Sequence, residues 1–338
     1  MAKSDLKIEP LAGTRSRIGV VRTDASEADL PGWLQTHRAA LDAGLLKHGA
    51  LLFEKTSLRT PSGFGEFIKA SSTTAWTGNP NLFSPRHQVE GAVYTSTDGW
   101  FAEKGKVESG PISQHCEFSH SPFRRWPMKL YFYCELPPGA GGETPIADPR
   151  AVFARLSNET KAKFAEHGLQ YSRVFYAGEV EWQQVFQTTE PAVVEAMCKA
   201  MGAQCEWREG HRNLALTWRL HVAAKHPRTG DWAWFNQAHV IAFSVIPAHV
   251  REHFLAKHGY EGRPMDCRFG DGSEIPLELI EQIQKAYLEE MVSFRWQQGD
   301  VLLLDNMLSS HGRASFSGPR RILVGMADEA NTQHVQTA

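Results

Sequence analysis

The chain has 338 residues, of which 42% are hydrophobic and 22% charged, and its formal net charge is −2. This composition is typical of a globular protein and argues against binding to nucleic acid or to an anionic membrane surface. No apolar run approaches the roughly 20 residues that a membrane-spanning helix needs, and no apolar stretch near Met1 resembles a signal peptide.

Cysteine usage and patterning indicate one domain in a reducing compartment. The five cysteines are scattered without a CxxC pair, so we expect free thiols and a cytoplasmic location. No repeat, low-complexity tract or linker divides the chain. We expect an N-terminal arm over residues 1–32, a single domain over residues 33–330 and a C-terminal tail over residues 331–338.

The first third of the chain predicts helices and loops around a short strand. Residues 33–48 have helical spacing of apolar side chains and precede an apolar run at residues 50–53 that is typical of a strand. A second helix is expected over residues 61–70 with Thr60 as its N-cap, because Pro61 then falls at the first helical position, where its missing N–H costs nothing. Residues 72–112 are rich in Gly, Ser, Thr, Asn and Pro and are expected to form active-site loops.

Strands and helices alternate irregularly through the rest of the chain. Helices are expected over residues 149–166, 190–201, 247–258 and 276–291. Strands are expected over residues 129–136, 143–147, 168–175, 213–223, 232–235 and 301–304. This order indicates a mainly β protein with helices (α+β), built as an antiparallel barrel or jelly roll decorated by N-terminal and inserted helices.

The segment His115-Cys116-Glu117 predicts a metal site. In an extended strand His115 and Glu117 share one face, while Cys116 points to the other and is expected to be a packed thiol. Two histidines and one carboxylate are the ligand set that holds non-heme Fe(II) with coordination positions left open. A candidate for the third ligand is His311, which follows the predicted strand at residues 301–304.

A pair of arginines follows the distal histidine. Arg320 and Arg321 come after a Gly-Pro turn and open an apolar run at residues 322–326. A guanidinium near a metal would bind the far carboxylate of a dicarboxylate cosubstrate in bidentate geometry. Because side chains alternate along a strand, only one of the two arginines can face the site.

Other polar residues near these motifs are expected to have roles other than metal binding. His120 lies on the opposite strand face from His115, and the segment is not HExxH, so His120 is not expected to be a ligand. Asp305 and Asn306 are expected to order the distal loop. His221, His226 and His239 are interpreted as structural or surface residues. The candidate substrate contacts are Tyr94, Ser96, Gln114, Asn236 and, for a substrate carboxylate, Arg86.

Four segments together resemble the TauD/TfdA-like family of Fe(II)/2-oxoglutarate-dependent oxygenases. They are residues 93–97, residues 115–117 with 125–127, residues 137–145 with a Gly-Gly-Glu-Thr turn, and residues 299–321. The resemblance spans about residues 33–327. Within the family, the chain is most similar in look to hydroxylases of the syringomycin-biosynthesis type.

The resemblance implies a double-stranded β-helix core with Fe(II) bound by His115, Glu117 and His311. It also implies 2-oxoglutarate bound by Thr144 and by the second arginine, Arg321, with O2 as the remaining cosubstrate. Glu117 is the carboxylate variant of clavaminate-synthase-like members, and a carboxylate here favours oxygenation over halogenation. Taurine-oxidising members hold the sulfonate with an arginine at the position of Gly325, so this chain is not expected to bind a sulfonate in that way.

The function that the resemblance implies is hydroxylation of an aliphatic C–H bond in a biosynthetic pathway, with release of succinate and CO2. The expected substrate is a small amino-acid-like molecule, either free or tethered to a carrier protein. One alternative keeps the cofactors but gives desaturation, cyclisation, or oxidation of a small phosphonate or sulfonate. A non-enzymatic alternative is a barrel that binds a metal without turnover.

Overall fold

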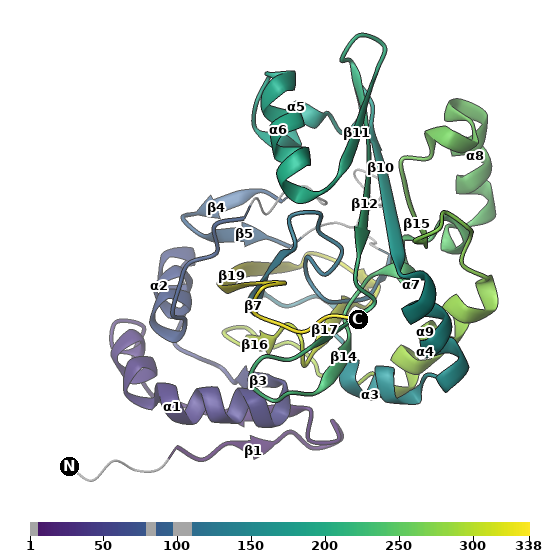
Figure 1. The fold of residues 1–338 in the computed structure, drawn as a ribbon. Coiled ribbons are helices and arrows are strands. Elements are labelled where there is room, and N and C mark those ends of the chain that lie inside the picture. The colour runs from purple at the N-terminus through teal and green to yellow at the C-terminus, as the bar shows by residue number, and fades with distance from the viewer. Residues whose placement is uncertain (1–5, 79–85, 97–109) are drawn as a thin grey trace.

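The computed structural model describes residues 6–78, 86–96 and 110–338. Within these residues, eight strands form the largest sheet, in the order β1-β2-β3-β16-β7-β19-β5-β4 (Figure 1). All neighbours in this sheet are antiparallel except β2 and β3. The bounds are β1 Glu9–Pro10, β2 Ile18–Val21, β3 Ala50–Phe53, β4 Gln88–Glu90, β5 Val93–Thr95, β7 Arg125–Leu136, β16 Val301–Asp305 and β19 Arg321–Asn331.

Strands β1 and β2 place Glu9–Pro10 and Ile18–Val21 in the sheet, which corrects, for these residues, the expectation of an arm over residues 1–32. All four residues of β2 are buried, and β2 pairs in parallel with β3. The connection between them is helix α1 (Leu30–His48), as a parallel pair requires a crossover. The apolar run of β2 is too short to stand out among polar neighbours, and its burial comes from the strand beside it.

Helices α1 and α2 (Pro61–Ser71) pack on one face of the large sheet. Their apolar side chains form one cluster with alternate residues of the strands, among them Tyr131 and Tyr133 of β7. The Thr60 hydroxyl accepts a hydrogen bond from the Gly63 N–H at 3.0 Å, which confirms the predicted N-cap.

The other face of the large sheet carries the second core cluster. Leu130, Phe132 and Cys134 of β7 point to this side, as strand alternation requires. Two smaller sheets are β6-β17-β9, which supplies Ile146 and Ala147 to this cluster, and β18-β8. Their bounds are β6 Ile112–His115, β8 Ala140–Gly141, β9 Ile146–Ala147, β17 Ser310–Arg313 and β18 Phe316–Ser317. The Phe132 ring lies 5.1 Å from the His311 ring, so this core borders the candidate metal ligands.

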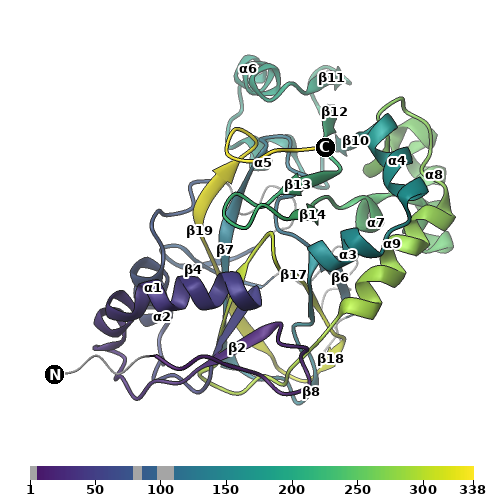
Figure 2. The ribbon, with the colours of Figure 1, turned by 60° about the horizontal axis from the view of Figure 1, so that its bottom comes forward.

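A four-stranded sheet, β11-β12-β10-β15, and a two-stranded sheet, β13-β14, complete the described strands. Figure 2 shows α1 and α2 on one side of the molecule and most later helices on the other. The strand bounds are β10 Leu169–Phe175, β11 Gln204–Arg208, β12 Asn213–Leu220, β13 Ala223–Lys225, β14 Trp232–Trp234 and β15 Met265–Phe269. The helix bounds are α3 Pro149–Arg155, α4 Asn158–His167, α5 Trp182–Phe186, α6 Pro191–Met201, α7 Ala238–Ile241, α8 Ala248–His258 and α9 Leu277–Glu290, with short 3-10 turns at Phe243–Val245 and Tyr260–Gly262.

The last residues are hydrogen-bonded to β13. The Ala338 carbonyl accepts from the Val222 and Ala223 N–H groups, and the Lys225 N–H donates to the Gln336 carbonyl. The expected tail over residues 331–338 is therefore held against the fold. The combination of these sheets and helices confirms the expected α+β class. Among the described residues, no helix is both long enough and apolar enough to cross a membrane.

Buried histidines in this core make stability depend on pH. His239 of α7 donates from Nε2 to the Gln114 carbonyl at 2.8 Å and stacks on Tyr287. Burial lowers the pKa of His239 to about 4 and that of His221 to about 4. The unfolded chain takes up protons on these rings below about pH 6.5, whereas the folded chain does not until about pH 4.

We therefore expect the free energy of unfolding to fall as the pH is lowered from about 6.5 to 4. Each such histidine contributes a slope of up to about 1.4 kcal/mol per pH unit. Urea titrations across this range should show a shallower slope for His239→Gln than for the unmodified chain. An unchanged slope in the variant would show that His239 titrates alike in the folded and unfolded states.

Candidate metal centre

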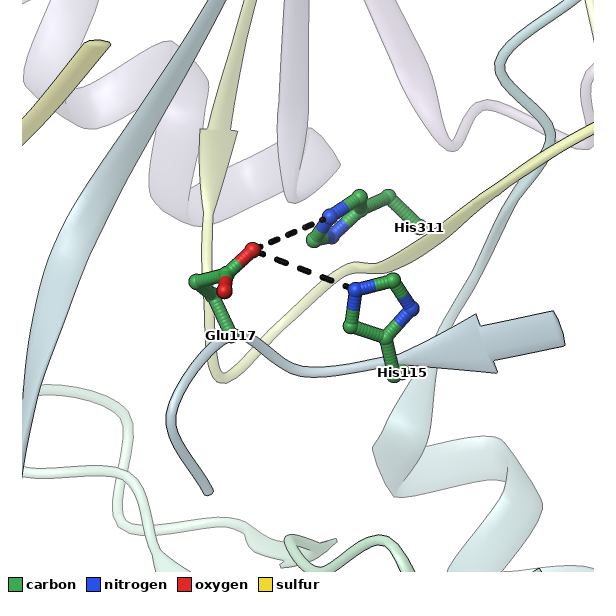
Figure 3. Close-up of side chains that lie close together, drawn as sticks. All are labelled: His115, Glu117 and His311. Atoms are coloured by element: carbon green, nitrogen blue, oxygen red, sulfur yellow. Dashed lines mark ion pairs between the residues drawn. The ribbon is translucent and has the colours of Figure 1, made fainter. Parts of the chain in front are cut away.

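His115, Glu117 and His311 form a cluster with the geometry of a metal site. One potential ligand atom from each residue lies within 4.8 Å of the others. The Nε2 atoms of His115 and His311 are 3.9 and 3.6 Å from Oε2 of Glu117. Figure 3 shows both imidazoles pointing toward the carboxylate. Two imidazoles and a carboxylate converging in this way fit a divalent transition metal such as Fe(II).

Strand pairing brings the two histidines together across 196 positions of sequence. β6 and β17 are antiparallel neighbours, and His311 is the direct partner of His115. Side chains of directly paired residues lie on the same face of a sheet. His115 Nδ1 contacts the Ser113 carbonyl at 2.9 Å, which leaves Nε2 for a metal.

Glu117 reaches the cluster from a turn, which corrects the expectation of one continuous extended strand. β6 ends at His115, and the turn that follows places Phe118 in the left-handed region with φ of 59°. Cys116 is fully buried, as expected for a packed thiol. The carboxylate position therefore depends on what holds this turn.

The side chain of Asn306 holds the turn. Its Oδ1 accepts from the Glu117 N–H at 2.7 Å, and its Nδ2 donates to the carbonyls of Glu117 and Pro127 at 2.9 and 2.8 Å. Asn306 is completely buried, and it follows β16 directly. Asn306 therefore holds the metal ligand Glu117 in place through both of its backbone polar groups, in addition to the expected role of ordering the distal loop.

Asn306→Ala should weaken metal binding without touching a ligand. We expect roughly 10- to 100-fold lower affinity for Fe(II), because the Glu117 carboxylate is no longer held in place. Loss of three buried hydrogen bonds should also cost about 3 kcal/mol of stability. Metal titration and urea unfolding would measure the two effects, with the exposed Asn158→Ala as control. Unchanged metal affinity in Asn306→Ala would contradict this role.

The electrostatics of the cluster favour the protonation states that bind metal. Burial lowers the pKa of His115 to about 4, aided by the charge of His311. Burial alone would raise the pKa of Glu117, but Arg86 and the two histidines outweigh it and hold this pKa below its ordinary value. Neutral imidazole and ionised carboxylate are the ligand forms of these groups. His120 is buried nearby but is not part of the cluster, as expected.

Of the two residues expected to bind the cosubstrate, Thr144 lies near the cluster, two residues before Ile146, the direct strand partner of His311, whereas Arg321 does not fit. Thr144 is buried, and its hydroxyl accepts from Trp296 Nε1. Arg320 donates from Nε to the Gly142 carbonyl at 3.1 Å, two residues before Thr144, and burial lowers its pKa to about 10. Arg321 instead points outward, with its side chain 49% exposed and paired with Glu135 at 2.6 Å. This geometry does not fit the predicted role of Arg321 and favours Arg320.

Strand alternation explains the reversal. Ile322, Val324 and Met326 of β19 belong to the core cluster on the metal side, whereas Leu323 and Ala327 belong to the cluster under α1 and α2. Arg321 therefore has the phase of Leu323 and points away from the metal, and Arg320 has the phase of Ile322. The alternation argument limited the choice to one arginine, and the side on which the metal lies decides which.

Of the candidate substrate contacts, Arg86 contacts the cluster, and Tyr94 and Ser96 interact with arginines. Arg86 donates from Nη2 to Oε2 of Glu117 at 3.0 Å. Burial raises the pKa of Tyr94 of β5, and the charge of the nearby Arg86 opposes this rise. Ser96 accepts from Nη1 of Arg320 at 3.4 Å. These positions suit residues that border a substrate.

Gln114 and Asn236, the other two candidate substrate contacts, are hydrogen-bonded within the fold. Gln114 donates to the Pro145 carbonyl and accepts from the Ser310 hydroxyl. Asn236 donates to the Val222 carbonyl and accepts from the Ala238 N–H. Because both ends of each side chain are bonded within the fold, this geometry does not fit the predicted substrate contacts.

Gly325 offers no room for an arginine directed at the site. A Cβ built on Gly325 would lie 2.2 Å from Cδ1 of Ile68 in α2, on the helix side of the large sheet. A larger side chain there would disturb the packing of α2. The structure thus agrees with the expectation that a sulfonate is not bound through this position.

One buried residue near the cluster escaped the sequence reasoning. Arg173 of β10 is 4% exposed. Leu169, Tyr171 and Phe175 alternate with polar residues in the same segment, so Arg173 occupies an inward position of the strand. The sequence contains a sign of this burial, because Arg173 has the same two-residue spacing as the apolar residues Leu169, Tyr171 and Phe175.

Comparisons of the sequence with known proteins agree with this geometry. The family profile described as "Taurine catabolism dioxygenase TauD, TfdA family" matches residues 7–327. The dapdiamide synthesis protein DdaC of Enterobacter agglomerans is 31% identical over 322 residues, which cover 95% of this chain and 94% of that protein. A clavaminate synthase-like protein of Arabidopsis thaliana is 28% identical over 313 residues, which cover 87% of this chain and 86% of that protein.

Solved structures share the fold. The PvcB protein of Pseudomonas aeruginosa has a TM-score of 0.58 at 12% identity, covering 99% of this chain and 97% of its own. A taurine dioxygenase of Burkholderia xenovorans has a TM-score of 0.53 at 13% identity, covering 96% and 89%. Together with the family match, these similarities confirm the expected α+β fold with a double-stranded β-helix core.

Proposed function

Because this chain belongs to the TauD, TfdA family and is an Fe(II)- and 2-oxoglutarate-dependent dioxygenase, we propose that it hydroxylates an aliphatic C–H bond of a small amino-acid-like substrate. The observation that carries the proposal is the cluster of His115, Glu117 and His311. Glu117 supplies a carboxylate where family halogenases have a small residue, which favours oxygen transfer.

The bound iron, with 2-oxoglutarate and O2, would supply the oxidant that converts C–H to C–OH while 2-oxoglutarate becomes succinate and CO2. The protein's own task is to hold the reactants in place and keep water and its own side chains away from the oxidant. In this proposal Thr144 and Arg320 hold the far carboxylate of 2-oxoglutarate. Support comes from the burial of Thr144, from the partial burial of Arg320 and from the contact of Arg320 with Gly142 in the same turn.

A role in natural-product biosynthesis is part of the proposal. It is supported by the similarity to DdaC, a protein named for dapdiamide synthesis, over nearly the full length of both chains. The substrate is a small molecule, either free or attached to a carrier protein, as in the syringomycin-type hydroxylases that the motifs resemble. Tyr94, Ser96 and Arg86 are the residues proposed to border it.

The first test is spectroscopic. Fe(II) and 2-oxoglutarate added without oxygen should produce a weak visible charge-transfer band from the chelated complex. Absence of the band in folded protein would overturn the assignment of the site.

The second test identifies the reaction. Succinate formation should be measured over a panel of free amino acids and carrier-bound aminoacyl groups, followed by product mass. Gain of one oxygen supports hydroxylation, whereas loss of two hydrogens would replace it by desaturation or cyclisation. A panel with no succinate above the substrate-free rate would contradict the proposed substrate class.

A further inference from the structure

The outward face of the four-stranded sheet carries a cavity of about 350 Å³, a volume within the range of small-molecule sites. Tyr171 and Phe175 of β10 point into the core, so the residues that alternate with them point to this outward face. Gln204, Thr217 and Ser172 line the cavity and are direct partners across β11, β12 and β10. The strands therefore present one row of polar groups to it.

This cavity is separate from the metal centre. The ring of His120, three residues after Glu117, lies 6.0 Å from the ring of Tyr171 on the inward face of β10. Trp218 of β12 donates to the His120 carbonyl at 2.9 Å from the same side. The described lining of the cavity includes none of the three candidate metal ligands. The sheet thus stands between the cavity and the turn that carries Glu117.

Two guanidinium groups share one carboxylate at the edge of the cavity. Asp266 is 4% exposed, and its Oδ2 atom lies 2.9 Å from Nε of Arg268 and 3.3 Å from Nε of Arg263. Its Oδ1 atom accepts from the backbone N–H groups of Phe243 and Cys267. Both arginines line the cavity. One negative charge balances only one of these two positive charges.

Three buried guanidinium nitrogens at this edge have no hydrogen-bond partner among the described residues. They are Nε and Nη1 of Arg263 and Nη2 of Arg268. Arg263 is 6% exposed, and its guanidinium carbon lies 3.7 Å from the centre of the Tyr260 ring, a contact that leaves its N–H groups unsatisfied. Buried charged groups without hydrogen bonds are costly, and an ion or ligand that completes the site is one explanation for them.

The other charged residues of the lining do not offset this excess. Both carboxylate oxygens of Glu206 accept from Arg208, at 3.1 and 3.3 Å, so these two charges balance each other. Glu261 is exposed to solvent, which screens its charge. The uncompensated positive charge is therefore concentrated at Arg263 and Arg268.

We propose that this cavity binds a small anion with a carboxylate or phosphate group, at a second site remote from the metal. The charge of a guanidinium is delocalised over its three nitrogens, so an anion in the cavity balances it from whichever edge it reaches. Ser172, Thr217 and Gln204 supply hydrogen bonds for the rest of the ligand. This site depends on neither the metal nor the proposed reaction.

The test uses matched pairs of probes that differ in their charged group. The full chain is loaded with Fe(II) without oxygen and titrated in a calorimeter with succinate and succinamide, and with glycerol 3-phosphate and glycerol. We expect the anion of at least one pair to bind at least about tenfold more tightly than its neutral partner, because hydrogen bonds to charged groups are the stronger ones. The pair that shows the difference identifies the anionic group as carboxylate or phosphate.

Variants locate the bound anion. Arg263→Gln and Arg268→Gln should each weaken its binding at least about tenfold. His115→Ala, which lacks a metal ligand, should bind the anion like the unmodified chain. The matched control is Arg212→Gln, which removes the same charge from an exposed arginine in the turn between β11 and β12, outside the lining. It should also bind like the unmodified chain.

Loss of binding in the two cavity variants, with binding kept in His115→Ala and Arg212→Gln, supports the inference. Equal affinity for the anion and its neutral partner in both pairs overturns it, as does unchanged binding in both cavity variants. Loss of binding in His115→Ala alone would place the anion on the metal and overturn it too. If Arg263→Gln does not fold, Arg268→Gln decides, because the Arg268 side chain is 19% exposed and less deeply packed.

Discussion

His115→Ala is expected to abolish Fe(II) binding and leave the fold intact. The substitution removes one of three ligands whose atoms lie within 4.8 Å of one another. The imidazole makes a hydrogen bond only two residues away, to Ser113, so few long-range contacts are lost. We expect an affinity loss above about 100-fold, more than loss of a residue that supports a ligand would cause, with a change in stability below about 1 kcal/mol.

The measurement is the charge-transfer band together with the iron content after gel filtration. His120→Gln is the matched control, because His120 lies in the same segment but outside the cluster. It should retain iron, although some loss of stability is expected from altering a buried side chain. Stoichiometric iron in His115→Ala would show that the metal is bound elsewhere.

Arg320→Gln is expected to weaken 2-oxoglutarate binding by about 30- to 100-fold, whereas Arg321→Gln should change it less than threefold. Arg320 is mostly buried beside the Gly142 turn, where a bidentate contact with a carboxylate is worth about 2–3 kcal/mol. Arg321 is half-exposed and paired with Glu135, and exposed ion pairs of this kind contribute 1 kcal/mol or less.

Titration of the charge-transfer band with 2-oxoglutarate compares the two variants under identical conditions. Because the two arginines are adjacent and receive the same substitution, each serves as the control for the other. A large effect of Arg321→Gln with none of Arg320→Gln would restore the original sequence interpretation and contradict the orientation in this structure.

Local patterns predicted most of the secondary structure. The helix at α2 begins at Pro61 after the Thr60 cap, because the cap and the proline act through neighbouring atoms. The buried strand β16 coincides with the apolar run at residues 301–304 and extends it to Asp305. The strand β2 was missed because its burial depends on parallel pairing with β3 across helix α1.

The roles of several polar residues could not be predicted from neighbouring residues alone. Gln114 and Asn236 are candidate substrate contacts in the sequence, but the Pro145 carbonyl, 31 positions from Gln114, and the Val222 carbonyl, 14 positions from Asn236, bind them within the fold. Arg173 was overlooked, although its phase in a buried strand was visible in the sequence. The role of a polar side chain depends on its partner, and for Gln114 one such partner is Ser310, 196 positions away.

The sequence by itself determined the chemistry available to this protein: two histidines, a carboxylate and a nearby arginine pair, in an order that a known oxygenase family shares. Tertiary structure alone decided how these groups are used. Pairing of β6 with β17 sets His115 against His311, and Asn306 fixes the turn of Glu117 from 189 positions away. In β19, Arg321 shares the face of Leu323, away from the metal, and Arg320 lies at the Gly142 turn. Ligand identity is a property of side chains, whereas convergence and orientation depend on long-range pairing and register, which no local pattern encodes.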